Sequence, residues 1–308
     1  MLLAQHLPMR LWLFVYKHKL LLIYVNTYSL SLSIIKLHKY PLLILPTGYS
    51  ALGRQRKNFM NDLIKWLDEK ITFLKQNEIM FVDGMPAIPK EALYTGIPDM
   101  IETYAHRHSV PHKIRSKTLL SYFDNDDNLI NRLFKIDDEI KELKLYGGIC
   151  GFDLSPCITM LRPRQKISLM VCAVFNCYLA LQGIKVLPNC RVGDLTSMSL
   201  IDTIPPYTNI ISGELGCHKS PLKMYGIYQL RLITKKVCPE ILFIYGNLSK
   251  KDIQYIFGRR PQIIILYPDH RHRVRDRKKA IVTKWDGVNL CKIPLSEYLE
   301  ERGAANGR

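Results

Sequence analysis

Short apolar segments recur at regular intervals in the second half of the chain. They are rich in Ile, Val, Phe and Tyr, and they cover residues 148–153, 184–189, 209–214, 240–246 and 262–269. Segments of helical periodicity separate them, and the clearest is 164–182, which starts beside Pro163 and stops before Gly183. Strands that are apolar on both faces and connected by helices are typical of a parallel sheet with covered faces. We therefore predict an α/β fold with a mainly parallel sheet, either open and doubly wound or barrel-like.

The first half of the chain carries helical patterns and loop signals. Residues 62–76 repeat apolar positions at helical spacing, which predicts an amphipathic helix in an N-terminal appendage. Residues 124–144 predict a charged helix, whereas prolines and glycines interrupt the stretch 78–115. These changes predict four parts. They are a basic, apolar leader with its helix (1–77), a loop-rich and helical lead-in (78–145), an α/β core (146–270) and a basic C-terminal tail (271–308).

Charge changes this picture more than overall composition does. The 308 residues are 47% hydrophobic and 23% charged, which excludes wholesale disorder. Lys and Arg number 44 against 27 Asp and Glu, so the net charge is +17. A field of this sign attracts nucleic acid, anionic lipid and phosphorylated ligands. The charge thus predicts the class of partner and leaves the chemistry open.

The apolar leader does not predict a membrane span. Its longest uncharged run, residues 20–35, contains Asn, Thr and Ser and is shorter than the roughly 20 apolar residues that a spanning helix needs. Residues 29–34 alternate polar and apolar side chains, as a strand does, and no A-x-A cleavage signal follows. We expect a cytoplasmic protein without a membrane role. Its first 59 or 79 residues form a leader, or the working chain starts at Met60 or Met80.

Polar side chains follow every predicted strand, where parallel α/β folds bind ligands. Asp153 and Glu214 form the candidate catalytic pair, because two neighbouring carboxylates can divide acid and base roles. In the alternative, Asp153 caps a turn and Glu214 pairs with Arg191. The candidate substrate-binding residues are Asn189, Arg191, Tyr245 and Asn247.

The eight cysteines include no C-x-x-C pair, which argues against zinc-ribbon and thioredoxin-like sites. We predict that most are core thiols in a reducing compartment. Cys217 beside His218 is a candidate nucleophile or ligand, although neighbouring side chains of an extended segment point to opposite faces.

Other motifs of site chemistry are missing or interrupted. Pro111 interrupts the group His106, His108 and His112, so we predict no metal site there. The chain has no phosphate loop, no G-x-G-x-x-G after a strand and no G-x-S-x-G. The cofactor and the oligomeric state therefore stay unassigned.

A second basic concentration, DHRHRVRDRKK at residues 269–279, follows the last predicted strand. If it is extended, its alternating arginines lie on one face, as contact with a phosphate backbone requires, and Tyr267 or Trp285 can stack on a base. The alternative is a solvated basic loop. The candidate DNA- or RNA-binding residues are Arg271, Arg273, Arg275, Arg277, Lys278 and Lys279.

Motifs at the strand ends of residues 78–270 resemble a known family. They are FDLS at 152–155, Pro188 and Asn189 with Arg191, the GC at 216–217 and the YG at 245–246. In this order they resemble the uncharacterised domain of unknown function 4417, found mainly in phages, prophages and mobile elements. The resemblance implies a cytoplasmic, mobile-element context and brings no established activity, catalytic residue or cofactor.

Three functions fit these residues. The first is a nucleic-acid-associated protein that uses its basic face. The second is a small-molecule hydrolase or transferase in which a carboxylate acts as base and Arg191 holds an anionic group. The third is an adaptor without chemistry.

Overall fold

A computed structural model of the chain describes residues 11–16, 19–24, 51–156, 160–213 and 223–306. The chain forms two units, Met1–Phe59 and Met60–Arg308. In the first unit, β1 (Leu11–Tyr16) pairs antiparallel with β2 (Lys19–Tyr24). The strand pattern at 29–34 lies outside the described residues. Helix α1 (Ala51–Gln76) runs across the boundary between the units.

In the described part of the second unit, seven parallel strands follow one another in chain order. The four-stranded sheet consists of β5 (Met100–Thr103), β6 (Thr118–Ser121), β7 (Gly148–Cys150) and β8 (Val186–Leu187). The five-stranded sheet begins with β9 (Ile210–Gly213), β10 (Ile241–Tyr245) and β11 (Gln262–Tyr267). A parallel bridge between Asn189 and Ile211 joins the two sheets. The predicted α/β fold with parallel strands is therefore confirmed.

The two sheets share one inner core, as a curved, barrel-like arrangement requires. Each parallel strand contributes an apolar side chain to this core, namely Ile101, Leu119, Cys150, Leu187, Ile211, Phe243 and Ile265. On the other side, Tyr267 of the last parallel strand donates a hydrogen bond to the carbonyl of Pro98, just before the first. The first and the last of the parallel strands, β5 and β11, thus approach each other, although they do not pair.

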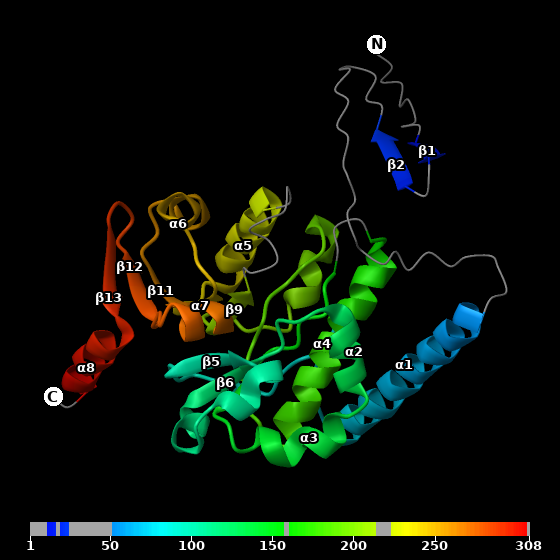
Figure 1. Cartoon of the computed structure of the whole chain (residues 1–308), viewed down its shortest axis with the longest axis horizontal. Helices are drawn as coiled ribbons and strands as arrows, with labels where there is room; N and C mark the ends of the chain where they lie inside the picture. The colour runs from blue at the N-terminus through cyan, green and yellow to red at the C-terminus, as the bar shows by residue number, and fades with distance from the viewer. Residues whose placement is uncertain (1–10, 17–18, 25–50, 157–159, 214–222, 307–308) are drawn as a thin grey trace, which may run out of the picture. The chain divides into compact units, whose positions relative to one another are not determined.

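Helices cover the outer faces of both sheets (Figure 1). The four-stranded sheet packs against α1, α2 (Asp126–Leu133), α3 (Ile136–Leu143) and α4 (Arg162–Leu181). The five-stranded sheet packs against α5 (Lys223–Val237) and α6 (Lys250–Phe257), which contact each other. The amphipathic helix predicted at 62–76 is confirmed, because Leu63, Trp66 and Leu74 are buried in the first of these cores.

The C-terminal part extends the sheet. After α7 (His270–Arg275), β12 (Ile281–Trp285) and β13 (Leu290–Pro294) pair antiparallel beside β11, and α8 (Leu295–Asn306) follows. Short elements complete the unit. They are β3 (Phe81–Val82), β4 (Met85–Pro86) and the 3-10 helices Lys90–Ala92, Tyr104–Ser109, His112–Lys117 and Leu195–Ile201.

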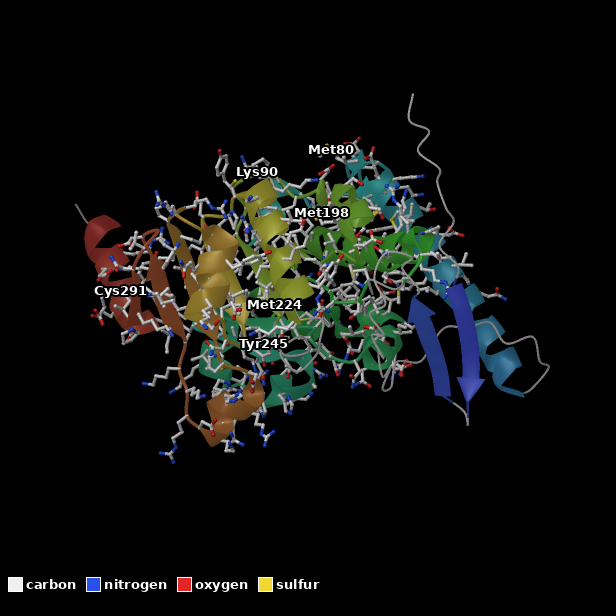
Figure 2. The ribbon with its side chains drawn as sticks, turned by 90° about the horizontal axis from the view of Figure 1, so that it is seen from above. Met80, Lys90, Met198, Met224, Tyr245 and Cys291 are labelled. Atoms are coloured by element: carbon white, nitrogen blue, oxygen red, sulfur yellow. The ribbon has the colours of Figure 1, made fainter. Side chains whose placement is uncertain are left out.

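Three of the six cysteines that the structure describes are core thiols, so the prediction that most of them are is not confirmed. Cys150, Cys177 and Cys190 are buried free thiols, and Cys291 is exposed on the β12–β13 pair, away from Tyr245 (Figure 2). Burial raises the pKa of Cys190 to about 12, so this thiol stays protonated at neutral pH. Within the described ranges, no helix combines the length and the apolarity that crossing a bilayer requires.

Candidate functional site

Three of the predicted site residues meet where β7 and β8 end. Asn189 Nδ2 donates a hydrogen bond of 2.6 Å to Asp153 Oδ1, and Arg191 Nε lies 3.3 Å from the same oxygen. Asp153 lies three residues after β7, and Asn189 lies two residues after β8. The carboxyl ends of neighbouring parallel strands meet at one edge of the sheet, which is why the sequence could predict this group.

A further carboxylate, which the sequence analysis did not select, joins this group. Asp126, in the first turn of α2, accepts a 3.2 Å hydrogen bond from the backbone N–H of Ser155. Arg191 Nη1 donates to Ser155 Oγ at 3.2 Å. We call these five residues, Asp126, Asp153, Ser155, Asn189 and Arg191, the Asp153 cluster.

Burial raises the pKa of Asp153 above its usual range, and the negative charge of Asp126 adds to this effect. The charge of Arg191 and the hydrogen bond from Asn189 oppose it. Burial likewise raises the pKa of Asp126. A buried carboxylate with a raised pKa is suited to proton transfer, provided that substrate can reach it.

The other predicted site residues do not join the Asp153 cluster within the described residues. Glu214, Cys217 and His218 lie outside the described residues, so the pairing of Asp153 with Glu214 stays a prediction. Tyr245 is fully buried and stacks on Phe123, with ring centroids 5.4 Å apart. Its hydroxyl accepts a hydrogen bond from the backbone N–H at the start of α7, so Tyr245 supports that helix.

Asn247 lies on the exposed loop that follows β10. Direct substrate contacts through Asn247 and Tyr245 stay predictions.

A second polar group, which the sequence analysis did not predict, lies where β5 and β11 end. Glu102 of β5 has no exposed surface, and its Oε2 lies 3.0 Å from His270 Nδ1 and pairs with Arg273 Nη2. The rings of His106 and His270 stack with centroids 3.6 Å apart and planes 13° apart. We call Glu102, His106, His270 and Arg273 the Glu102 cluster.

The electrostatics of this cluster favour neutral imidazole at His106. Partial burial of the ring and the charge of His270 lower the pKa of His106, and Asp124 opposes them. Two stacked imidazolium rings would repel each other, whereas neutral rings retain lone pairs that can accept a proton or bind a metal.

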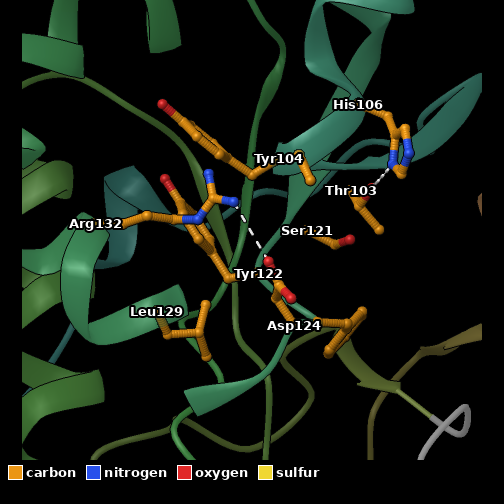
Figure 3. A pocket seen from close by; sticks show the side chains of 10 residues that line it. Thr103, Tyr104, His106, Ser121, Tyr122, Asp124, Leu129 and Arg132 are labelled. Carbon is orange, nitrogen blue, oxygen red and sulfur yellow. Dashed lines mark hydrogen bonds and ion pairs between the residues drawn. The ribbon is translucent and has the colours of Figure 1, made fainter. Parts of the chain in front are cut away.

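A pocket of about 140 Å³ opens beside the Glu102 cluster. Thr103, His106 and Ser121 line one part of it, and Asp124 and Arg132, which form an ion pair of 3.3 Å, line another (Figure 3). Ser121 Oγ is buried and has no hydrogen-bond partner among the described residues. A ligand in this pocket therefore meets an unused hydroxyl, an imidazole and a charge pair.

The basic segment, residues 269–279, begins at the same edge. It is helical from His270 to Arg275, so the extended geometry that would align its arginines on one face does not occur there. Asp269 caps this helix by accepting from the backbone N–H of His272. Arg273 is held by Glu102, and Arg275 pairs with Asp276. Arg271, Arg277, Lys278 and Lys279 are exposed and form no ion pair with any described residue.

A comparison of the chain with protein-family models, curated proteins and solved structures finds no match. The resemblance to domain of unknown function 4417 therefore stays a prediction. The two clusters, the pocket and the basic segment are the features that can support a function.

Proposed function

We propose that this protein binds nucleic acid at the carboxyl edge of its parallel strands, with the basic segment contacting the phosphate backbone. The observation that carries the proposal is the attachment of this segment to the buried end of β5. Glu102 accepts from Arg273, and Tyr245 accepts from the His270 backbone, so the start of the segment is held at the edge where parallel folds bind ligands.

The charges that remain available support this function. Four exposed cations of the segment have no described carboxylate within 4.0 Å, and Lys and Arg outside such ion pairs are the groups that displace counterions from a phosphate backbone. Arg273 and Arg275 are already paired, so we assign backbone contact to the other four. Such contacts bind without reading sequence.

The test is a titration of fluorescent 20-nucleotide single-stranded DNA, duplex DNA and RNA with the full chain, read by anisotropy at several salt concentrations. We expect the binding constant for duplex DNA to fall steeply with salt, by a log–log slope of about −0.9 for each phosphate contacted. Absence of binding to all three probes at low salt, or binding that salt does not weaken, would reject the proposal.

A second function, hydrolysis or group transfer on an anionic small molecule, is favoured by the Asp153 cluster. Its three predicted members meet within hydrogen-bond distance, and burial raises the pKa of Asp153, as a general acid or base requires. In this function Arg191 holds the anionic group of the substrate while Asp153 moves a proton.

The second function is tested by assaying the full chain on generic phosphate and carboxylate esters and comparing Asp153→Asn with wild type. We expect the conservative change to lower kcat by at least about 100-fold, since a positioned acid or base contributes typically 10²–10⁴-fold. An activity that Asp153→Asn leaves intact excludes Asp153 from the chemistry.

A further inference from the structure

We propose that Glu102, His106 and His270 form a binding site for one divalent transition-metal ion of the Zn²⁺ class. Each residue offers one ligand atom, and the three atoms lie within 4.8 Å of one another. Two imidazole nitrogens with one carboxylate oxygen are a donor set that such ions bind well, and hard ions such as Mg²⁺ prefer oxygen ligands alone.

The fold brings the three donors together from distant parts of the chain. Glu102 lies on β5, His106 lies one turn later in a 3-10 helix, and His270 opens α7 after β11. Glu102 and His270 are 168 residues apart in sequence, and their ligand atoms lie 3.0 Å apart. A metal ion bound here would replace this hydrogen bond and link β5 to the start of α7.

Thr103 sets the tautomer of His106 that metal binding requires. The rings of His106 and His270 stack with planes 13° apart, so His106 turns out of the stack for both lone pairs to point at one ion. The Thr103 hydroxyl lies 2.8 Å from His106 Nδ1 and can donate its proton towards Glu102 Oε1, 3.5 Å away. With its proton directed to Glu102, the hydroxyl oxygen accepts from Nδ1–H, and Nε2 of His106 keeps its lone pair. A histidine ligand whose other nitrogen donates a hydrogen bond is the usual arrangement at metal sites.

The neighbouring pocket independently indicates a bound ligand. Ser121 is 1% exposed, and no group in the described part of the chain bonds to its Oγ, although a buried hydroxyl without a hydrogen bond is costly. Ser121 pairs in register with Thr103, and both line the pocket together with His106. A water molecule or substrate oxygen on the metal would be placed to use this hydroxyl, because three protein ligands leave coordination positions open.

The guanidinium of Arg273 contacts the same atoms that would bind the metal ion. It pairs with Glu102 Oε2 and lies 3.2 Å from His270 Nδ1, two of the atoms that would bind the ion. Zinc binding and the Arg273 pair therefore compete. When the metal binds, Arg273 is released into the basic segment, where its charge becomes available to an anionic partner.

The test is calorimetric titration of the metal-free full chain with Zn²⁺, without nucleic acid, so that its outcome does not depend on the proposed function. We expect wild type to bind one equivalent. His106→Ala and His270→Ala should each weaken this binding by at least about tenfold, because even residues that only orient ligands change affinity by 10–100-fold.

His112→Ala is the matched control, since His112 is exposed in the next 3-10 helix and forms no ion pair with a described residue. It should bind Zn²⁺ like wild type. Arg273→Met should bind more tightly, because it removes the competing cation. His106 is itself exposed, so its alanine variant should keep the wild-type circular dichroism spectrum. The site is overturned if wild type takes up no equivalent of zinc, or if His106→Ala weakens binding no more than His112→Ala.

Discussion

Replacing Glu102 by glutamine removes a fully buried negative charge with little change of shape. Its carboxylate contacts the Thr103 backbone N–H at 2.8 Å, His270 at 3.0 Å and Arg273. The amide oxygen of Gln can still accept a hydrogen bond, but the ion pair with Arg273 is lost. The substitution therefore isolates the charge that holds α7 to β5.

The expected loss follows from burial on the two sides of the pair. Breaking a buried ion pair costs about 3–5 kcal/mol, because the remaining charge stays buried without a partner. Here the Arg273 side chain is 26% exposed, so water compensates part of that cost. We expect Glu102→Gln to lower the free energy of unfolding by about 2 kcal/mol. With a urea m-value of about 3 kcal/mol/M, the midpoint should fall by roughly 0.7 M.

Urea unfolding of the full chain, followed by circular dichroism, measures this loss. Glu301→Gln is the control, because Glu301 pairs with Lys284 at the surface and is 50% exposed. Exposed ion pairs contribute about 0–1 kcal/mol, so its midpoint should hardly move. Equal midpoints for the two variants would show that Glu102 does not anchor the basic segment.

Four further substitutions test how local geometry stabilises the second unit. Gly148→Ala should destabilise it by about 3 kcal/mol, because φ is +146° and a new Cβ would lie 2.4 Å from the Lys185 carbonyl; Gly303→Ala, with open space around it in a helix, should raise the thermal midpoint slightly. Ser249→Ala removes the N-cap of α6 and should cost about 1 kcal/mol in urea unfolding. Burial alone would raise the pKa of Asp252, but hydrogen bonds with Ser249 help to lower it below its usual range. Asp252 therefore stabilises the fold at neutral pH and loses this contribution as pH falls through its folded pKa, so Asp252→Asn should flatten the acid side of the stability profile.

The repeating part of the fold could be predicted from the sequence. All five predicted strands contain observed strands, and the helix predicted at 164–182 corresponds to α4 (Arg162–Leu181). Alternating apolar strands and helices leave few other topologies, and this alternation placed Asp153 and Asn189 at one edge. Because carboxyl ends of neighbouring parallel strands meet at one edge, Arg191 was also expected near Asp153.

The short or irregular parts could not be predicted in this way. β5 and β6 span four residues each in a region of prolines and 3-10 turns, too short for a periodic signal. The charged stretch 124–144 has one helical pattern but breaks at Phe134 and Lys135 into α2 and α3. The Glu102 cluster joins residues 168 positions apart, and without β5 no sequence pattern connects Glu102 to His270.

Binding of DNA at the carboxyl edge is tested most sharply by two double variants of equal charge. Lys278→Ala/Lys279→Ala removes two cations from the basic segment, whereas Lys141→Ala/Lys144→Ala removes two exposed cations at the end of α3, just before β7 and so at the opposite edge. Binding of both to duplex DNA is followed by anisotropy as a function of salt. We expect the first variant to lose affinity and its log–log salt slope to shrink by about 2, while the second behaves like wild type. Equal slopes in the two variants would contradict nucleic-acid binding at the carboxyl edge.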